Sequence, residues 1–167
     1  MPKSDQYIDS QLYSVIPRVL VFVFKNDEIL LIKGASNKRI WAGKYNGIGG
    51  HVERGESVLE AARRELKEEA GITKCDLWLS EIVSVDVEKS KGVCLFVYKG
   101  IYSDGKIQVS KEGELKWVNI NSISSLPIVE DLPVLLSRVI KHEKNAPVLF
   151  ARSFYNEQMR LITEFNA

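Results

Sequence analysis

Residues 50–72 read GHVERGESVLEAARRELKEEAGI, and this stretch says most about the fold. It predicts a helix over residues 57–70 that ends at Gly71, because glycine readily adopts the left-handed conformation that closes a helix. At 100° per residue, the apolar positions of this helix form one stripe that faces the core. The members of the stripe are Val58, Leu59, Ala62, Leu66 and Ala70.

Three glutamates of this helix do not lie where charged residues are expected. The solvent-facing side is predicted to carry Glu60, Arg63, Arg64 and Lys67. Glu65 and Glu69 instead border the apolar stripe, and Glu68 lies further round the same flank. Carboxylates three and four residues apart repel one another. Beside an apolar surface they also need a cation to be tolerated.

The available ligands indicate which kind of cation would bind. The glutamates supply only oxygen, with no cysteine or histidine pair nearby, and this favours Mg²⁺ or Mn²⁺ over zinc. The paired glycines Gly49 and Gly50 let backbone groups approach such a site closely. Hard cations held by carboxylates beside a glycine-rich loop are typical of phosphate chemistry. The residues therefore predict a metal-dependent enzyme that acts on phosphates.

The whole chain predicts a single domain, residues 1–167, of mixed α and β structure. Strands are expected over 16–24, 29–33, 45–48, 80–87, 93–102 and 115–120. The C-terminal part, 130–167, is expected to hold a helix over 132–141 and then a hairpin of 148–155 with 159–165.

Composition excludes several classes of protein. A net charge of +1 on 167 residues argues against a surface that binds nucleic acid. The longest apolar stretch, 19–24, is too short to cross a membrane. Cys75 and Cys94 lack metal or redox spacing and are expected to be buried thiols rather than a disulfide. The polar first eleven residues carry no export signal, so a cytoplasmic location is expected.

The 50–72 segment resembles a known signature. From Gly50, five residues lead to Glu56, and seven more lead to Arg64-Glu65-Leu66-Lys67-Glu68-Glu69-Ala70-Gly71-Ile72. This is similar at every defined position to the Nudix box, GX5EX7REUXEEXGU. The resemblance implies a Nudix-type α/β/α sandwich with a mixed β-sheet. It also implies hydrolysis of a nucleoside diphosphate linked to another moiety.

The resemblance also implies roles for single residues. Glu65, Glu68 and Glu69 match the family's metal-binding glutamates, with the Gly49 carbonyl as a further ligand for Mg²⁺ or Mn²⁺. Gly50, Glu56, Arg64 and Gly71 match structural positions of the box, and Glu56 with Arg64 braces the loop against the helix. Water would attack a bridging phosphorus. Glu65 is the candidate general base, with Glu112 or Glu114 in a later loop as the other choice. Glu53 falls where many members carry an acid near the metals.

The substrate is suggested by residues outside the box. Residues 41–50, Trp-Ala-Gly-Lys-Tyr-Asn-Gly-Ile-Gly-Gly, resemble the approach to the box in MutT-type hydrolases of oxidised purine nucleoside triphosphates. That resemblance makes Asn46 a candidate for contacting the base and Glu130-Asp131 a candidate for the purine edge. The structural alternatives are that Asn46 only forms a loop turn and that Glu130-Asp131 only provide favourable charge at the N-terminus of the following helix. Trp117 is expected either to stack on a base or to pack in the core.

The predicted function is hydrolysis of (oxidised) purine nucleoside triphosphates such as 8-oxo-dGTP to monophosphate and pyrophosphate. The partner is a small-molecule nucleotide, and the sequence does not predict an oligomeric state. One alternative is a Nudix hydrolase of ADP-ribose, a dinucleoside polyphosphate or another nucleoside diphosphate derivative. A second alternative is a nucleotide sensor without turnover, although such modules often lose box glutamates.

Overall fold

The structure is a computed structural model that describes residues 2, 5–6, 11–36, 41–103, 105, 107–108 and 113–166. Nine strands form one mixed sheet, in the order β3-β2-β1-β6-β5-β8-β9, with β4 paired to β1 and β7 paired to β2. The strands are β1 (Ser14–Lys25), β2 (Glu28–Gly34), β3 (Tyr45–Asn46), β4 (Ile48–His51), β5 (Asp76–Asp86), β6 (Lys91–Ile101), β7 (Gly113–Asn119), β8 (Leu149–Tyr155) and β9 (Leu161–Phe165). The helices are α1 (Val58–Ala70), the 3₁₀ helix η2 (Ile120–Ser125) and α2 (Leu132–Val139).

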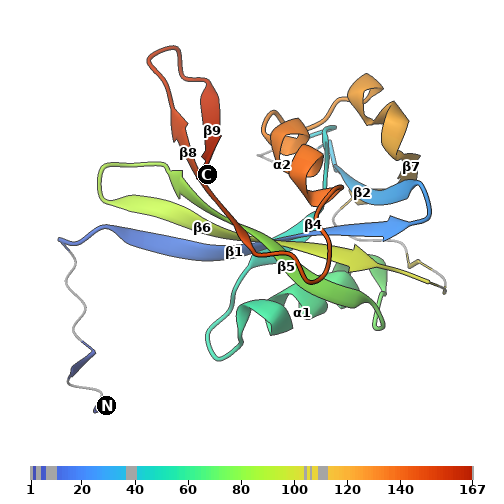
Figure 1. The fold of residues 1–167 in the computed structure, drawn as a ribbon, viewed down its shortest axis with the longest axis horizontal. Coiled ribbons are helices and arrows are strands. Elements are labelled where there is room, and N and C mark those ends of the chain that lie inside the picture. Colours follow the sequence, from blue (N-terminus) through green and yellow to red (C-terminus); the bar gives the residue numbers. More distant parts are fainter. Residues whose placement is uncertain are drawn as a thin grey trace.

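Helices α1 and α2 cover opposite faces of this sheet (Figure 1). The α1 side has its own core, which includes Val21 and Leu66. The α2 side has a second core, which includes Phe22 and Leu135. Successive residues of β1 feed the two cores in turn, because side chains alternate across a strand. The layered α/β/α arrangement and the mixed sheet confirm the predicted fold class.

Strand β1 is the centre of the sheet and determines where the glycine-rich loop lies. One edge of β1 runs parallel to β6. The other edge is shared, because β4 pairs with residues 18–21 and β2 pairs with residues 23–25. The loop that enters α1 therefore leaves from the middle of the sheet rather than from its rim.

Helix α1 has the bounds that its sequence predicts, because both of its ends are determined locally. The Ser57 side chain accepts a hydrogen bond from the Glu60 N–H, and the Glu60 side chain accepts one from the Ser57 N–H. This reciprocal arrangement is a capping box. At the other end Gly71 has φ = 68°, in the left-handed region, and it closes the helix.

Several other expectations need correction. The single strand expected over 45–48 is two strands, β3 and β4, separated at Gly47. A Cβ at Gly47 would lie 2.8 Å from the Phe22 ring, so this glycine lets the chain lie close to β1. Strand β5 begins at Asp76 rather than at residue 80, and its pairing with β6 contains an irregularity between Leu79 and Glu81. Helix η2 was not predicted.

His142, just beyond α2, is buried. Its side chain accepts a hydrogen bond from Trp78 Nε1 at 3.2 Å and lies 3.0 Å from the Pro147 carbonyl oxygen. Lys99 donates to the carbonyls of Ile140 and His142, just beyond α2. These contacts attach the C-terminal end of α2 to the sheet.

The hairpin of β8 and β9 confirms the expected terminal hairpin. Its last residue, Phe165, packs against the core on the α2 side, and the Arg138 guanidinium lies 4.9 Å from the centre of the Phe165 ring. Cys75 and Cys94 are free thiols, but both are partly exposed rather than buried as expected. No helix in the described ranges is long and apolar enough to span a bilayer.

Candidate functional site

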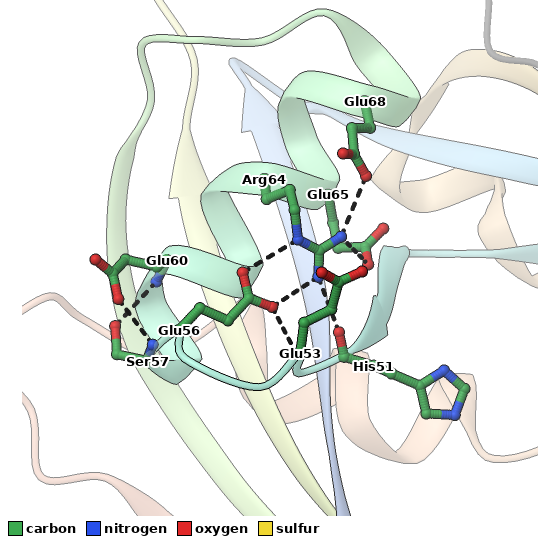
Figure 2. A network of polar contacts seen from close by, with 8 residues as sticks. All are labelled: His51, Glu53, Glu56, Ser57, Glu60, Arg64, Glu65 and Glu68. Carbon is green, nitrogen blue, oxygen red and sulfur yellow. Dashed lines mark hydrogen bonds and ion pairs between the residues drawn. The ribbon is translucent and has the colours of Figure 1, made fainter.

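Arg64 lies at the centre of a polar network that joins the loop before α1 to the helix itself (Figure 2). Its guanidinium makes two hydrogen bonds to the Glu56 carboxylate, of 3.1 and 2.8 Å. It makes a third, of 2.9 Å, to the His51 carbonyl. The Glu53 N–H also donates to Glu56, at 2.7 Å. The bonds to Arg64, followed by that from Glu53, hold the pKa of Glu56 below its ordinary value.

The same guanidinium contacts two of the three candidate metal ligands. Arg64 Nη1 lies 2.8 Å from Glu65 Oε1 and 3.1 Å from Glu68 Oε2. The helical pattern placed Arg64 on the solvent side, but the structure shows its side chain folded back over the helix and only 23% exposed. This corrects the sequence expectation. Arg64 offsets the repulsion among the clustered carboxylates and fixes their orientation.

Glu69 and Glu65 are buried as the pattern predicted, while Glu68 is exposed. The Gly49 N–H lies 3.4 Å from Glu69 Oε2, so β4 and α1 meet at this carboxylate. A Cβ on Gly50 would overlap the Glu65 carboxylate. A Cβ on Gly49 would overlap the Val19 carbonyl oxygen. The backbone of β1 therefore requires a glycine at position 49, whereas a side chain at position 50 would displace the Glu65 carboxylate.

The direction of the Gly49 carbonyl follows from strand geometry. In an antiparallel pair, the N–H and C=O of one residue point to the same side of the strand, and residues alternate between sides. Gly49 donates to Glu69 rather than to β1, and two residues on, the His51 carbonyl accepts from Arg64. The Gly49 carbonyl therefore also points away from β1, toward α1 and its glutamates.

The donor set of this site fits a hard divalent cation. It consists of three carboxylates and one backbone carbonyl, and Mg²⁺ and Mn²⁺ prefer such oxygen ligands. Within the described residues, no three carboxylate, imidazole or thiolate groups already lie together as a finished metal site. Arg64 instead draws Glu65 and Glu68 to itself, so a cation at this place would share them with the guanidinium.

Elsewhere, β3 brings the approach segment alongside the start of α2. The Tyr45 N–H donates to the Pro127 carbonyl at 2.8 Å, and the Val129 N–H donates to the Tyr45 carbonyl at 3.1 Å. Lys44 Nζ lies 3.9 Å from Glu130 Oε1, although both side chains are well exposed. Asn46 and Glu130-Asp131 therefore belong to neighbouring segments, as a shared base-binding site requires.

The contacts of Asn46 and Asp131 help to distinguish a base-binding role from a purely structural role for each residue. The Asn46 side-chain oxygen accepts from the Gly47 N–H at 2.8 Å, so the loop-turn interpretation accounts for one of its polar atoms. Asp131 occupies the N-cap position of α2 but makes no side-chain capping bond. Burial raises the pKa of its carboxyl, and the neighbouring Glu130 charge adds to the effect. Helix capping therefore does not account for the partly buried Asp131 carboxyl, and its binding role stays a prediction.

The remaining candidates have less support. Glu53 is exposed, as is Glu114, which lies within strand β7 and not in the expected loop. Glu112 lies outside the described residues. Trp117 is partly buried and stacks on Tyr102 at a centroid distance of 6.3 Å, which agrees with the packing alternative.

Glu81 is a buried acid that the sequence pattern did not predict. Glu81 is fully buried on the α2 side of β5, and neither of its carboxylate oxygens has a hydrogen-bond partner among the described residues. Desolvation raises its pKa to about 8, partly countered by Arg138. The signal was an acid inside the apolar run Leu79-Ser80-Glu81-Ile82-Val83, where a charge is not expected.

Fold and polar network together define the class of proteins built around a Nudix box. A model of the NUDIX domain family matches residues 15–139, and the chain therefore belongs to that family.

Among its relatives is a protein of Danio rerio named oxidized purine nucleoside triphosphate hydrolase. It is 32% identical over 105 residues, which cover 62% of this chain and 66% of that protein. A protein of Stutzerimonas stutzeri named NAD-capped RNA hydrolase NudC is 28% identical over 113 residues, which cover 66% of this chain and 39% of that protein. The crystal structure of a MutT protein from Bacillus halodurans superposes with a TM-score of 0.76 at 25% identity, and it covers 91% of this chain and 98% of that one.

Proposed function

We propose that this Nudix hydrolase is a metal-dependent pyrophosphohydrolase of purine nucleoside triphosphates, with oxidised purines such as 8-oxo-dGTP as preferred substrates. The products are the nucleoside monophosphate and pyrophosphate. The observation that carries the proposal is the complete set of box glutamates, oriented by Arg64 and facing the Gly49 backbone. The relatives differ in their named substrates, so the choice of a purine triphosphate rests on Asn46 and Asp131.

The phosphate end is assigned to α1 and β4. Glu65, Glu68, Glu69 and the Gly49 carbonyl are the groups that would hold Mg²⁺ or Mn²⁺. When bound, the ion supplies polarisation of phosphoryl oxygens and activation of water. Arg64 is a positioning residue, because it fixes the carboxylates of Glu65 and Glu68. We assign Glu65 as the base that accepts the proton of the attacking water.

The base end is assigned to β3 and the start of α2. The Asn46 amide offers a donor and an acceptor to a purine edge. The Asp131 carboxyl, with its raised pKa, takes up a proton more readily than an ordinary aspartate. It then offers a donor and an acceptor side by side, and an oxidised purine presents such a pair across N7–H and O8. This complementarity favours an oxidised over a normal purine.

A substrate screen tests the proposal directly. Consumption of each substrate and the identity of its products are measured by chromatography, with Mg²⁺ and with EDTA, over the normal nucleoside triphosphates, 8-oxo-dGTP, ADP-ribose, NADH and diadenosine polyphosphates. We expect the highest kcat/KM on 8-oxo-dGTP and none of this activity in EDTA. Activity on sugar-linked diphosphates alone would reject the substrate class. Tight nucleotide binding without hydrolysis of any compound would show a sensor.

The base contacts are tested by binding. The affinity for 8-oxo-dGMP is measured by calorimetry in the wild type, in Asn46→Ala and in Asp131→Ala. Loss of a base-edge contact costs about 1–3 kcal/mol, so we expect each variant to bind roughly tenfold or more weakly. Undiminished binding in both variants would rule out this pocket.

A further inference from the structure

Trp41 has a backbone conformation that bulky residues rarely adopt. Its φ is 61°, in the left-handed region, where a Cβ crowds the following carbonyl and costs about 1–2 kcal/mol. Trp41 is 47% exposed, so about half of its surface is open to solvent. Strained residues that survive in a fold tend to lie at functional sites.

Backbone contacts of its carbonyl and of the residues that follow hold Trp41 in this conformation. The Lys44 N–H donates to the Trp41 carbonyl at 3.0 Å, and Gly43 and Lys44 are in turn bonded to Gly34 at the end of β2. The Trp41 carbonyl lies so close to Gly34 that a Cβ there would overlap it. The turn over residues 41–44 is thus attached to the sheet, and this fixes the backbone from which the indole ring projects.

That place adjoins the proposed base-binding segments. Lys44, which closes the Trp41 turn, contacts Glu130 through its side chain. The next residue, Tyr45, is bonded to the segment that leads into α2. An exposed indole at this rim offers a flat face on which a base can stack, and base–aromatic stacking is worth about 1–3 kcal/mol.

We propose that Trp41 is a specificity-determining residue that stacks on the base of a bound nucleotide, and that its strained backbone is retained for this contact. The inference rests on the proposed function, because it places the base beside Asn46 and Asp131. Mutation of Trp41 can separate its effect on the stability of the fold from its effect on nucleotide affinity.

The test compares binding with stability in Trp41→Gly. Glycine adopts φ = 61° without strain, and this offsets part of the packing lost with the half-buried indole, so the thermal midpoint Tm should change little. Affinity for 8-oxo-dGMP, measured by calorimetry, should fall about tenfold to a hundredfold. Affinity for inorganic pyrophosphate, which has no base, should not change. In Trp41→Phe, which keeps an aromatic face, most of the nucleotide affinity should remain.

Met159 provides a matched control, because it also has a positive φ, of 57°, and is 75% exposed, but in the hairpin turn. Met159→Gly should keep or raise Tm and leave nucleotide affinity unchanged. Unchanged nucleotide affinity in Trp41→Gly would overturn the inference, and so would failure of Trp41→Phe to retain binding. If the wild type binds no nucleotide at all, the proposed function itself fails, so the two failures are distinguishable.

Discussion

The two helices that flank the sheet differ in how their polar groups are satisfied. On the α1 side, the carboxylates of Glu56, Glu65 and Glu68 share one guanidinium, and the helix N-terminus has a complete capping box. On the α2 side, Asp131 stands at the N-cap without capping, and Glu81 is buried with no hydrogen-bond partner in the described part of the chain.

This difference suggests a division of labour. The α1 side is pre-organised around fixed charges, as the stabilisation of a phosphate transition state requires. The α2 side keeps carboxyls that are desolvated and readily protonated, and such groups suit hydrogen bonds to a neutral base. The comparison therefore predicts that substitutions beside α1 affect turnover, whereas substitutions beside α2 affect binding and pH dependence.

The largest expected effect is on the α1 side. Glu69→Gln and Glu68→Gln each remove a charged oxygen ligand but keep the size of the side chain. Each should lower kcat by orders of magnitude, with Tm close to that of the wild type. Glu60→Gln, on the solvent face of the same helix, is the control and should keep kcat. Near-normal turnover in either ligand variant would contradict the metal assignment.

A smaller effect is expected from Arg64→Lys, which keeps the charge but loses the forked geometry that reaches three carboxylates. Loss of such a positioning group typically costs about 10–100-fold. We expect kcat to fall by that factor and the Mg²⁺ concentration for half-maximal rate to rise. Arg63→Lys, one residue earlier and exposed, should change neither value. A raised KM with normal kcat and normal Mg²⁺ dependence would place Arg64 elsewhere in the mechanism.

Glu81 gives the α2 side a pH dependence of its own. Its folded-state pKa of about 8 lies above the ordinary value of 4.5. The folded protein therefore holds a proton that the unfolded chain has lost, and stability falls as pH rises from about 4.5 to about 8. Glu81→Gln cannot ionise and should not show this fall. Denaturant unfolding at pH 9 should find it more stable than the wild type by on the order of 3 kcal/mol.

At pH 4 the two proteins should differ little, because Glu81 is then protonated in both states. The stability of the wild type is compared with that of Glu81→Gln between pH 5 and pH 9. If the difference does not change over this range, the Glu81 carboxyl has a hydrogen-bond or ionic partner in solution.

The smallest effects compare the two helix N-termini. Ser57→Ala removes one bond of the capping box and should cost about 1 kcal/mol in unfolding free energy, with kcat little changed. Asp131→Ala should cost less than Ser57→Ala, because Asp131 makes no capping bond. Urea unfolding of both variants measures the difference. A larger loss in Asp131→Ala would restore the helix-charge interpretation of that residue.

The sequence predicted the α1 side better than the α2 side, for physical reasons. The ends of α1 depend on Ser57, Glu60 and Gly71, which lie within or beside the helix, so local pattern was enough. The burial of Glu81 and His142 depends on how α2 packs over β5, between segments far apart in the chain. The folded-back Arg64 was implied by the resemblance to the family and not by helical periodicity, which describes where a side chain starts and not where it ends.

The central claim is that the α1 side performs the chemistry and the α2 side selects the base. The ratio of kcat/KM for 8-oxo-dGTP to that for dGTP, compared between the wild type and Asp131→Ala under saturating Mg²⁺, tests it most directly. We predict a ratio well above ten in the wild type, which falls toward one in the variant while the kcat for dGTP is preserved. An unchanged ratio, or a loss of kcat on both substrates, would contradict the division of labour.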